Sequence, residues 1–199
     1  MAAITRKIEL YIDKRNLTED EYKAQWQYIR QIDNTLFLAA NRISSHCLLN
    51  DELEIRLKLQ MPEYCEIEKS LRNSKKYKLS KEEISELKLR RKELDAVVKR
   101  QKEEFLKTSQ NSTYQLVAYE FTNIPTDILT NLNNDIVSKY TDARFDIANG
   151  LKSHSTYKKG IPIPFSVNKE APFVYIDGEY YFDWFERKTK KGHRQSFTV

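Results

Sequence analysis

Apolar and polar side chains alternate over residues 4–13, with Ile8, Leu10 and Ile12 on one side of the predicted backbone. A period of two residues is typical of a half-buried strand. We therefore expect a first strand over residues 4–13. No hairpin partner follows it immediately, so its pairing strands must come from much later in the chain.

After this strand the apolar positions recur every three or four residues, which indicates an amphipathic helix. Thr18 and Glu21 have the spacing of a capping box, in which each side chain accepts a hydrogen bond from the other residue's backbone amide. The pattern predicts a helix from about Glu19 to about His46, where the apolar stripe ends. Residues 50–78 carry no decided pattern.

A second capping signature, Ser80 with Glu83, opens a helix that we expect over residues 80–107. Its apolar positions follow a narrow, heptad-like seam, which is typical of a helical hairpin arm more than of a buried core helix. No other segment of the sequence is an evident packing partner for the apolar face of this arm. We therefore expect that it can join two copies of the chain in a homodimer.

Two further helices are predicted over residues 113–121 and 126–149, on either side of Ile124-Pro125. Asn149-Gly150 is a helix stop signal, because glycine readily adopts the left-handed conformation that follows many helices. Helices are thus expected to fill the middle of the chain.

Beyond the last predicted helix the pattern becomes strand-like. Two prolines confine residues 161–165 to an edge strand or an extended segment. The runs Phe173–Ile176 and Glu179–Phe185 flank Asp177-Gly178, which is the strongest short-range hairpin signal in the chain. Residues 196–199 predict another strand, and the chain stops inside it.

These elements predict an α+β fold class, with a small antiparallel β domain and a long, mostly helical insertion after its first strand. We expect residues 1–15 to supply the first strand, residues 16–150 to form the helical domain, and residues 151–199 to add a basic linker and the later strands. Such a β domain looks unfinished. It either borrows strands from a partner or belongs to a longer protein.

The composition favours a folded chain over a disordered one, since 40% of the 199 residues are hydrophobic and only four are glycine. No apolar run approaches the roughly 18 residues that span a membrane, and the N-terminus lacks the apolar core of a signal peptide. We expect a cytoplasmic protein without membrane contact.

The search for catalytic chemistry is mostly negative. The histidines, His46, His154 and His193, have no cysteine, serine elbow or carboxylate at the spacing of a known active site. Cys47 and Cys65 form no zinc-binding motif, and a reduced thiol pair is favoured over a disulfide. Glycine-rich phosphate-binding loops are absent. We expect no enzyme activity, no metal and no cofactor.

The charge pattern points to nucleic acid without requiring it. The net charge is +5, and residues 151–199 hold nine Lys/Arg against five Asp/Glu, with aromatic residues between them. Cations can contact phosphates and aromatic faces can stack on bases, although such an excess also serves solubility. For the aromatic residues of the predicted strands, a plain sheet core is favoured. For the Lys/Arg run over residues 187–194, nucleic-acid contact and simple solvation are equally open interpretations.

The last predicted helix and the segment after it carry a family resemblance. The run Lys139-Tyr-Thr-Asp-Ala-Arg-Phe-Asp-Ile-Ala-Asn-Gly-Leu-Lys-Ser, followed by Tyr157-Lys-Lys-Gly-Ile-Pro-Ile-Pro-Phe165, resembles miniature type V CRISPR effectors and their transposon-encoded relatives. In that family, this segment joins the last recognition-lobe helix to the wedge domain. The opening strand and the long helix after it also resemble the start of these proteins.

The resemblance implies that the strands form part of a wedge or OB-like barrel and that the helices form a recognition lobe. Such a lobe cradles guide RNA and the guide–target duplex, while base pairing reads the sequence. Together, the charge pattern and the resemblance nominate as nucleic-acid-binding residues Arg6, Lys7, Lys139, Arg144, Lys152, Tyr157, Lys158, Lys159, Arg187, Lys188, Lys190, Lys191 and Arg194.

The departures from the family matter too. Its members continue into a nuclease with a carboxylate triad and into a zinc ribbon with paired cysteine motifs, and neither is present in this sequence. We therefore expect binding of guide RNA and target DNA without cleavage. Two alternatives stay open. The chain can be an anti-CRISPR-like inhibitor that mimics part of an effector and binds a protein partner, or a coiled-coil adaptor without a nucleic-acid role.

Overall fold

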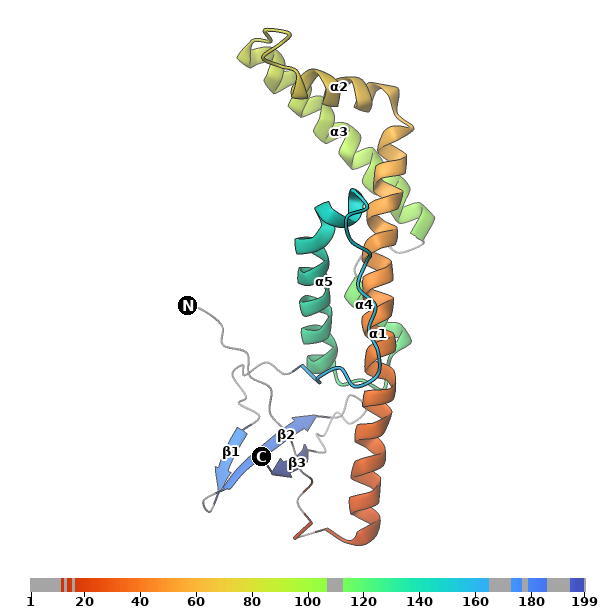
Figure 1. The fold of residues 1–199 in the computed structure, drawn as a ribbon, viewed down its shortest axis with the longest axis vertical. Helices are drawn as coiled ribbons and strands as arrows, with labels where there is room; N and C mark the ends of the chain where they lie inside the picture. The colour runs from red at the N-terminus through yellow and green to blue at the C-terminus, as the bar shows by residue number, and fades with distance from the viewer. Residues whose placement is uncertain are drawn as a thin grey trace. The chain divides into compact units, whose positions relative to one another are not determined.

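The structure is a computed structural model that describes residues 12, 14, 15, 17–106, 113–164, 173–176, 179–185 and 194–198, the strand residues by their backbone only. Five helices and three strands lie within these ranges (Figure 1). They are α1 (Glu19–Leu59), α2 (Pro62–Arg72), α3 (Lys81–Leu106), α4 (Thr113–Glu120), α5 (Thr126–Ala148), β1 (Phe173–Ile176), β2 (Glu179–Phe185) and β3 (Arg194–Thr198).

The contacts divide the chain into two compact units. The first comprises Met1–Ser44 together with Thr113–Val199, and the second comprises Ser45–Ser112. Helix α1 is continuous from one unit into the other. The helical region expected over residues 16–150 therefore contributes to both units.

The expected α+β fold class with a barrel part is wrong. Helices of 41, 11, 26, 8 and 23 residues dominate the part of the chain that the structure describes. The described strands form one open, three-stranded sheet in the order β1-β2-β3, in which each strand pairs only with its sequence neighbour. A barrel needs a closing pair between its outer strands, and no such pair lies among the described residues. The fold is predominantly helical.

Helix α1 begins where the capping box predicts. The Thr18 amide donates to Glu21 Oε2 at 2.8 Å, and the Glu21 amide donates to Thr18 Oγ1 at 3.3 Å. The expected end near His46 is wrong, because the helix continues to Leu59. Its last turns are weakly apolar, and contacts with distant residues of the second unit stabilise them.

The first unit has a helical core, which α1, α4, α5 and the turn before α5 line with fully or almost fully buried apolar side chains. They are Ile32, Leu36, Ala39, Ala40, Ile43, Val117, Ile124, Ile128, Leu129, Leu132, Ile136 and Tyr140. Helices α4 and α5 pack against each other. The buried apolar residues of α1 and α5 follow one another at steps of three and four residues, as the sequence predicts.

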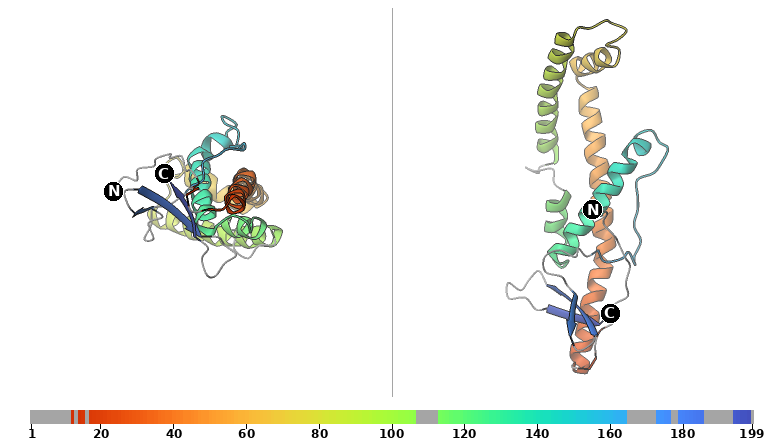
Figure 2. Two further views of the ribbon diagram at one scale, coloured as in Figure 1. Left: turned by 90° about the horizontal axis from the view of Figure 1, so that it is seen from below. Right: turned by 90° about the vertical axis from the view of Figure 1, so that its left-hand side faces the viewer.

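The second unit contains the last turns of α1 and a hairpin of α2 and α3. Helices α2 and α3 lie side by side in both Figure 1 and Figure 2. Tyr64, Ile67 and Leu94 form its buried cluster. Helix α3 begins with the predicted capping box, in which the Glu83 amide donates to Ser80 Oγ at 3.1 Å. The undecided stretch over residues 50–78 contains the end of α1 and the whole of α2.

Helix α5 ends at the predicted stop signal. Gly150 has a φ of +70°, and the amides of Leu151 and Gly150 donate to the carbonyls of Asp146 at 2.8 Å and Ile147 at 3.0 Å. This is the Schellman pattern, which satisfies the last carbonyls of a helix. The chain therefore leaves α5 in a fixed direction.

The predicted hairpin is confirmed at the level of the backbone. Strands β1 and β2 are antiparallel, with Ile176 opposite Glu179, as the predicted hairpin requires. Strand β3 begins at Arg194, two residues before the predicted start. The predicted first strand lies almost wholly outside the described residues; Ile12, which is described, is buried and is not in a strand.

Candidate nucleic-acid interface

Residues 151–164 form an extended segment without helix or strand, which runs along the middle of α1 (Figure 1). Ser44 Oγ donates to the carbonyl of Ser155 at 2.7 Å. One helical turn earlier in α1, Asn41 contacts Tyr157. As the residue numbers fall along α1 they rise along the segment, so the two run antiparallel.

Asn41 holds the segment with two hydrogen bonds to one residue. Its Nδ2 donates to the Tyr157 carbonyl at 2.8 Å, and its Oδ1 accepts from the Tyr157 amide at 2.7 Å. One amide side chain therefore replaces the pairing that a neighbouring strand would give. Both bonds are partly buried, and partly buried backbone groups need such partners. The segment is fixed without belonging to a sheet.

The next two residues after this clamp are Lys158 and Lys159, and both are exposed. Lys159 Nζ lies 4.0 Å from Asp33 Oδ2, at the limit of an ion pair. At this distance and exposure the attraction is weak. The clamp thus presents two neighbouring lysines on a backbone of defined position.

Three further predicted residues lie on the second half of α5 and at the start of the same segment. Lys139 Nζ pairs with Asp135 at 2.6 Å, and Lys152 Nζ pairs with Asp146 at 2.9 Å. Arg144 is exposed on the same helix. Exposed ion pairs contribute little net energy, so both lysines can exchange their carboxylate for a phosphate at low cost.

The remaining predicted residues are not brought together by the described structure. Arg6, Lys7, Arg187, Lys188, Lys190 and Lys191 lie outside the described residues. Arg194 is described by its backbone, which pairs with Phe185 in the sheet. The described part of the predicted site is therefore the end of α5 together with residues 151–164.

Sequence reasoning missed the residues that support this site. Asn41 and Ser44 were not predicted, and neither was the pair between Arg42 and Glu120, in which the guanidinium makes bonds of 2.9 to 3.1 Å to the carboxylate. Each of these partners lies 78 to 116 residues away along the chain. No local spacing signals such a contact.

The described residues include no group of three His, Cys, Asp or Glu side chains that could hold a metal ion. Cys47 and Cys65 are free thiols. Burial, with a smaller effect of Asp51, raises the pKa of the Cys47 thiol to about 11. Cys47 is therefore protonated at neutral pH and is a poor nucleophile. No helix among the described residues is long and apolar enough to cross a membrane.

No protein-family model matches this chain, and a search of the curated proteins finds no match either. The resemblance over residues 139–165 stays a prediction.

Proposed function

We propose that this chain is the RNA-guided DNA-binding lobe of a miniature type V CRISPR effector-like protein, which binds guide RNA and target DNA and does no chemistry itself. The observation that carries the proposal is the Asn41 clamp on residues 151–164. It fixes the backbone from which Lys158 and Lys159 project into solvent.

A fixed basic segment suits a duplex whose sequence is read by base pairing. In such complexes the protein contacts the phosphate backbone and recognises the shape of the duplex. Contacts to phosphate set the register and release counterions, so they dominate affinity. Lysines on a held backbone lose less conformational freedom on binding than lysines on a loose loop.

The resemblance supports the proposal at the same place. The stretch that resembles the family, residues 139–165, includes the second half of α5 and the whole of residues 151–164. The cations nominated there are exposed, namely Lys139, Arg144, Lys152, Lys158 and Lys159, whereas the nominated Tyr157 is partly buried. A cytoplasmic location fits this role, since guide RNA and invading DNA meet in that compartment.

Binding of a labelled RNA–DNA heteroduplex of about 20 base pairs tests the proposal, with a DNA duplex of the same length beside it. The test variant carries Lys158→Glu and Lys159→Glu. The control variant carries Lys75→Glu and Lys76→Glu, which change the same charge at two neighbouring exposed lysines of the second unit.

We expect the native chain to prefer the heteroduplex and to lose affinity steeply between about 50 and 200 mM salt. The test variant should bind at least about 10-fold more weakly, and its salt slope should fall by about two, one for each lost phosphate contact. The control should change far less. Equal loss in both variants would show unspecific charge attraction and would contradict the proposal. A stable complex with a protein and none with the heteroduplex would instead support an inhibitor.

A further inference from the structure

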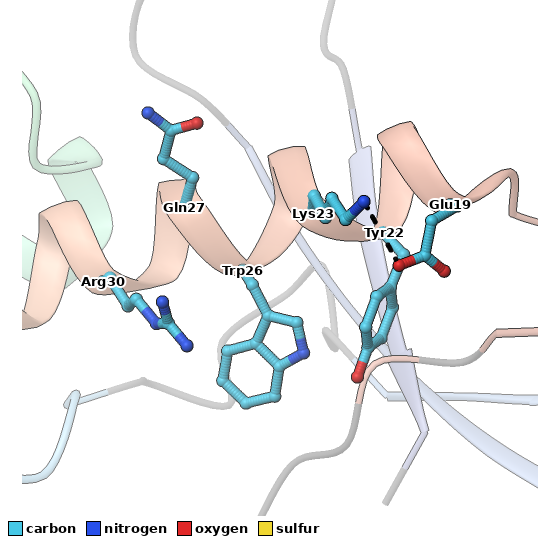
Figure 3. Close-up of a pocket in the computed structure, with 6 residues that line it drawn as sticks. All are labelled: Glu19, Tyr22, Lys23, Trp26, Gln27 and Arg30. Carbon is cyan, nitrogen blue, oxygen red and sulfur yellow. Dashed lines mark ion pairs between the residues drawn. The ribbon is translucent and has the colours of Figure 1, made fainter.

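The first turns of α1 carry a second group of side chains that the clamped segment does not use. Tyr22, Trp26 and Arg30 follow one another at intervals of four residues, so they lie along one face of the helix. Figure 3 shows all three projecting to the same side of α1. We call these three residues the aromatic face. They border an open hollow of about 550 Å³, lined by Glu19, Tyr22, Lys23, Trp26, Gln27 and Arg30.

The aromatic face is not part of the helical core. No side chain from Glu19 to Gln31 is fully buried, and the buried stripe of α1 begins at Ile32. Tyr22 and Trp26 each keep part of their surface exposed. Partly exposed tyrosine and tryptophan side chains are common, and they can offer an apolar face together with a polar tip to a ligand.

A cation lies over each of the two rings. The two rings meet edge to face, with centroids 6.4 Å apart and planes at 87°. Cations lie at both ends of the group: Lys14 Nζ is 4.2 Å from the Tyr22 ring centroid, and the Arg30 guanidinium carbon is 6.0 Å from that of Trp26.

Aromatic rings flanked by cations match the chemistry of a nucleotide. The base stacks on the ring, and the phosphates on either side of it meet the positive charges. An apolar peptide would gain nothing from these cations and would have to desolvate them, whereas the phosphates of a nucleic acid are attracted to them.

We propose that the aromatic face binds an unpaired nucleotide of single-stranded nucleic acid by stacking its base on Trp26. This inference rests on the proposed function. It adds that the lobe binds a single strand in addition to the duplex of guide and target. Stacking of a base does not depend on whether the sugar is ribose or deoxyribose. Both RNA and DNA single strands can therefore bind in this way, and the experiment compares the two.

The experiment follows Trp26 fluorescence in a Trp184→Phe background, where Trp26 is the one tryptophan left of the two in the chain. Oligo-dT and oligo-U of about ten nucleotides are the probes, and a DNA duplex of equal length is the comparison. We expect both single strands to quench the fluorescence and the duplex to leave it nearly unchanged. The tighter of the two oligomers identifies the source of the strand.

Affinities of variants are then measured by anisotropy of labelled oligomers. Trp26→Ala should weaken binding about 10-fold or more, Trp26→Phe should keep most of it, and Arg30→Gln should weaken it several-fold. Tyr119→Ala is the matched control, because Tyr119 is 86% exposed on α4 and lies outside the hollow. Circular dichroism verifies that each variant keeps its helices, and Arg30→Gln decides the matter if Trp26→Ala does not fold.

Unchanged oligomer affinity in the folded Trp26→Ala and Arg30→Gln variants would overturn this inference. So would quenching by the duplex equal to that by the single strands. Neither result touches heteroduplex binding through Lys158 and Lys159, which tests the proposed function separately. A native chain that does not bind the heteroduplex but binds oligomers in a Trp26-dependent way would overturn the proposed function and leave the stacking site standing.

Discussion

The side chain of Asn41 forms hydrogen bonds with both the amide and the carbonyl of Tyr157, a residue 116 positions away in the sequence. The distances of 2.7 and 2.8 Å are those of well-formed bonds. A carboxylate at this position could accept from the amide but could not donate to the carbonyl. The amide of asparagine is therefore the group that suits both bonds.

Replacing Asn41 should loosen the segment after α5. We expect Asn41→Ala to lower the free energy of unfolding by about 1 to 3 kcal/mol, because it leaves two partly buried backbone groups without their partner. Trypsin should also cleave faster after Lys158 and Lys159, as followed by mass spectrometry. Asn34→Ala, at an exposed position two turns earlier in α1, is the control. Equal cleavage rates in both variants would mean that the clamp does not hold the segment.

The second unit should lose stability at acidic pH through Glu54. Burial alone raises the pKa of this carboxyl, but hydrogen bonds from Lys58 and Lys102 and the charges of these lysines outweigh it and lower the pKa to about 2. The two bonds are 2.8 and 3.0 Å long. In the unfolded chain the carboxyl returns to its ordinary pKa of 4.5.

These two pKa values determine how the stability changes with pH. A lowered pKa in the folded state stabilises the protein above about pH 4.5, and this contribution disappears as the pH falls from 4.5 towards 2. At pH 7 we expect Glu54→Gln to be less stable than the native chain by on the order of 2 kcal/mol. Urea unfolding across this pH range checks it. The difference should shrink to near zero at pH 2. Glu52→Gln, at an exposed position of the same helix, is the control.

The parts of the fold that sequence predicts well are the ones decided locally. Thr18 with Glu21 marks the start of α1, and Ser80 with Glu83 marks the start of α3, because a capping box involves residues three positions apart. The end of α1 is different. Its last turns are held by partners such as Lys102, 48 residues beyond Glu54, so no local pattern could extend the predicted helix to Leu59.

The same reasoning explains the candidate site. Lys158 and Lys159 could be nominated from the sequence, because a cluster of cations is visible in the charge pattern without knowledge of its contacts. Asn41 could not, because an asparagine on the polar side of a helix is common and gains meaning only from the segment against it. The expected barrel failed for a related reason: strand signals predict hairpins, but closure depends on pairing between distant strands.

Gly150 tests how far backbone conformation alone directs the chain after α5. Its φ is +70°, and an added Cβ would meet no atom within 4 Å. Any cost of Gly150→Ala therefore comes from the left-handed backbone and not from a clash. We expect a loss of about 1 kcal/mol, with Gly150→Asn closer to the native chain because asparagine tolerates this conformation. Equal losses in both variants, measured by thermal unfolding, would contradict this reasoning.

Arg42 and Glu120 connect α1 to α4 across 78 residues of sequence, with three bonds of 2.9 to 3.1 Å. Both side chains are partly exposed, so water and salt weaken the attraction. A double-mutant cycle of Arg42→Ala and Glu120→Ala should give a coupling energy of about 0.5 to 1 kcal/mol in low salt. It should fall at 1 M salt, where screening is strong.

Arg42→Lys separates charge from geometry in this pair. Lysine keeps the positive charge but lacks the planar fork that contacts both carboxylate oxygens of Glu120. We expect this variant to lose most of the coupling energy, because the pair gains more from two-oxygen geometry than from net charge at an exposed position. Coupling retained in full by the lysine variant, and unaffected by salt, would mean that neither the fork nor the charge stabilises the contact between α1 and α4.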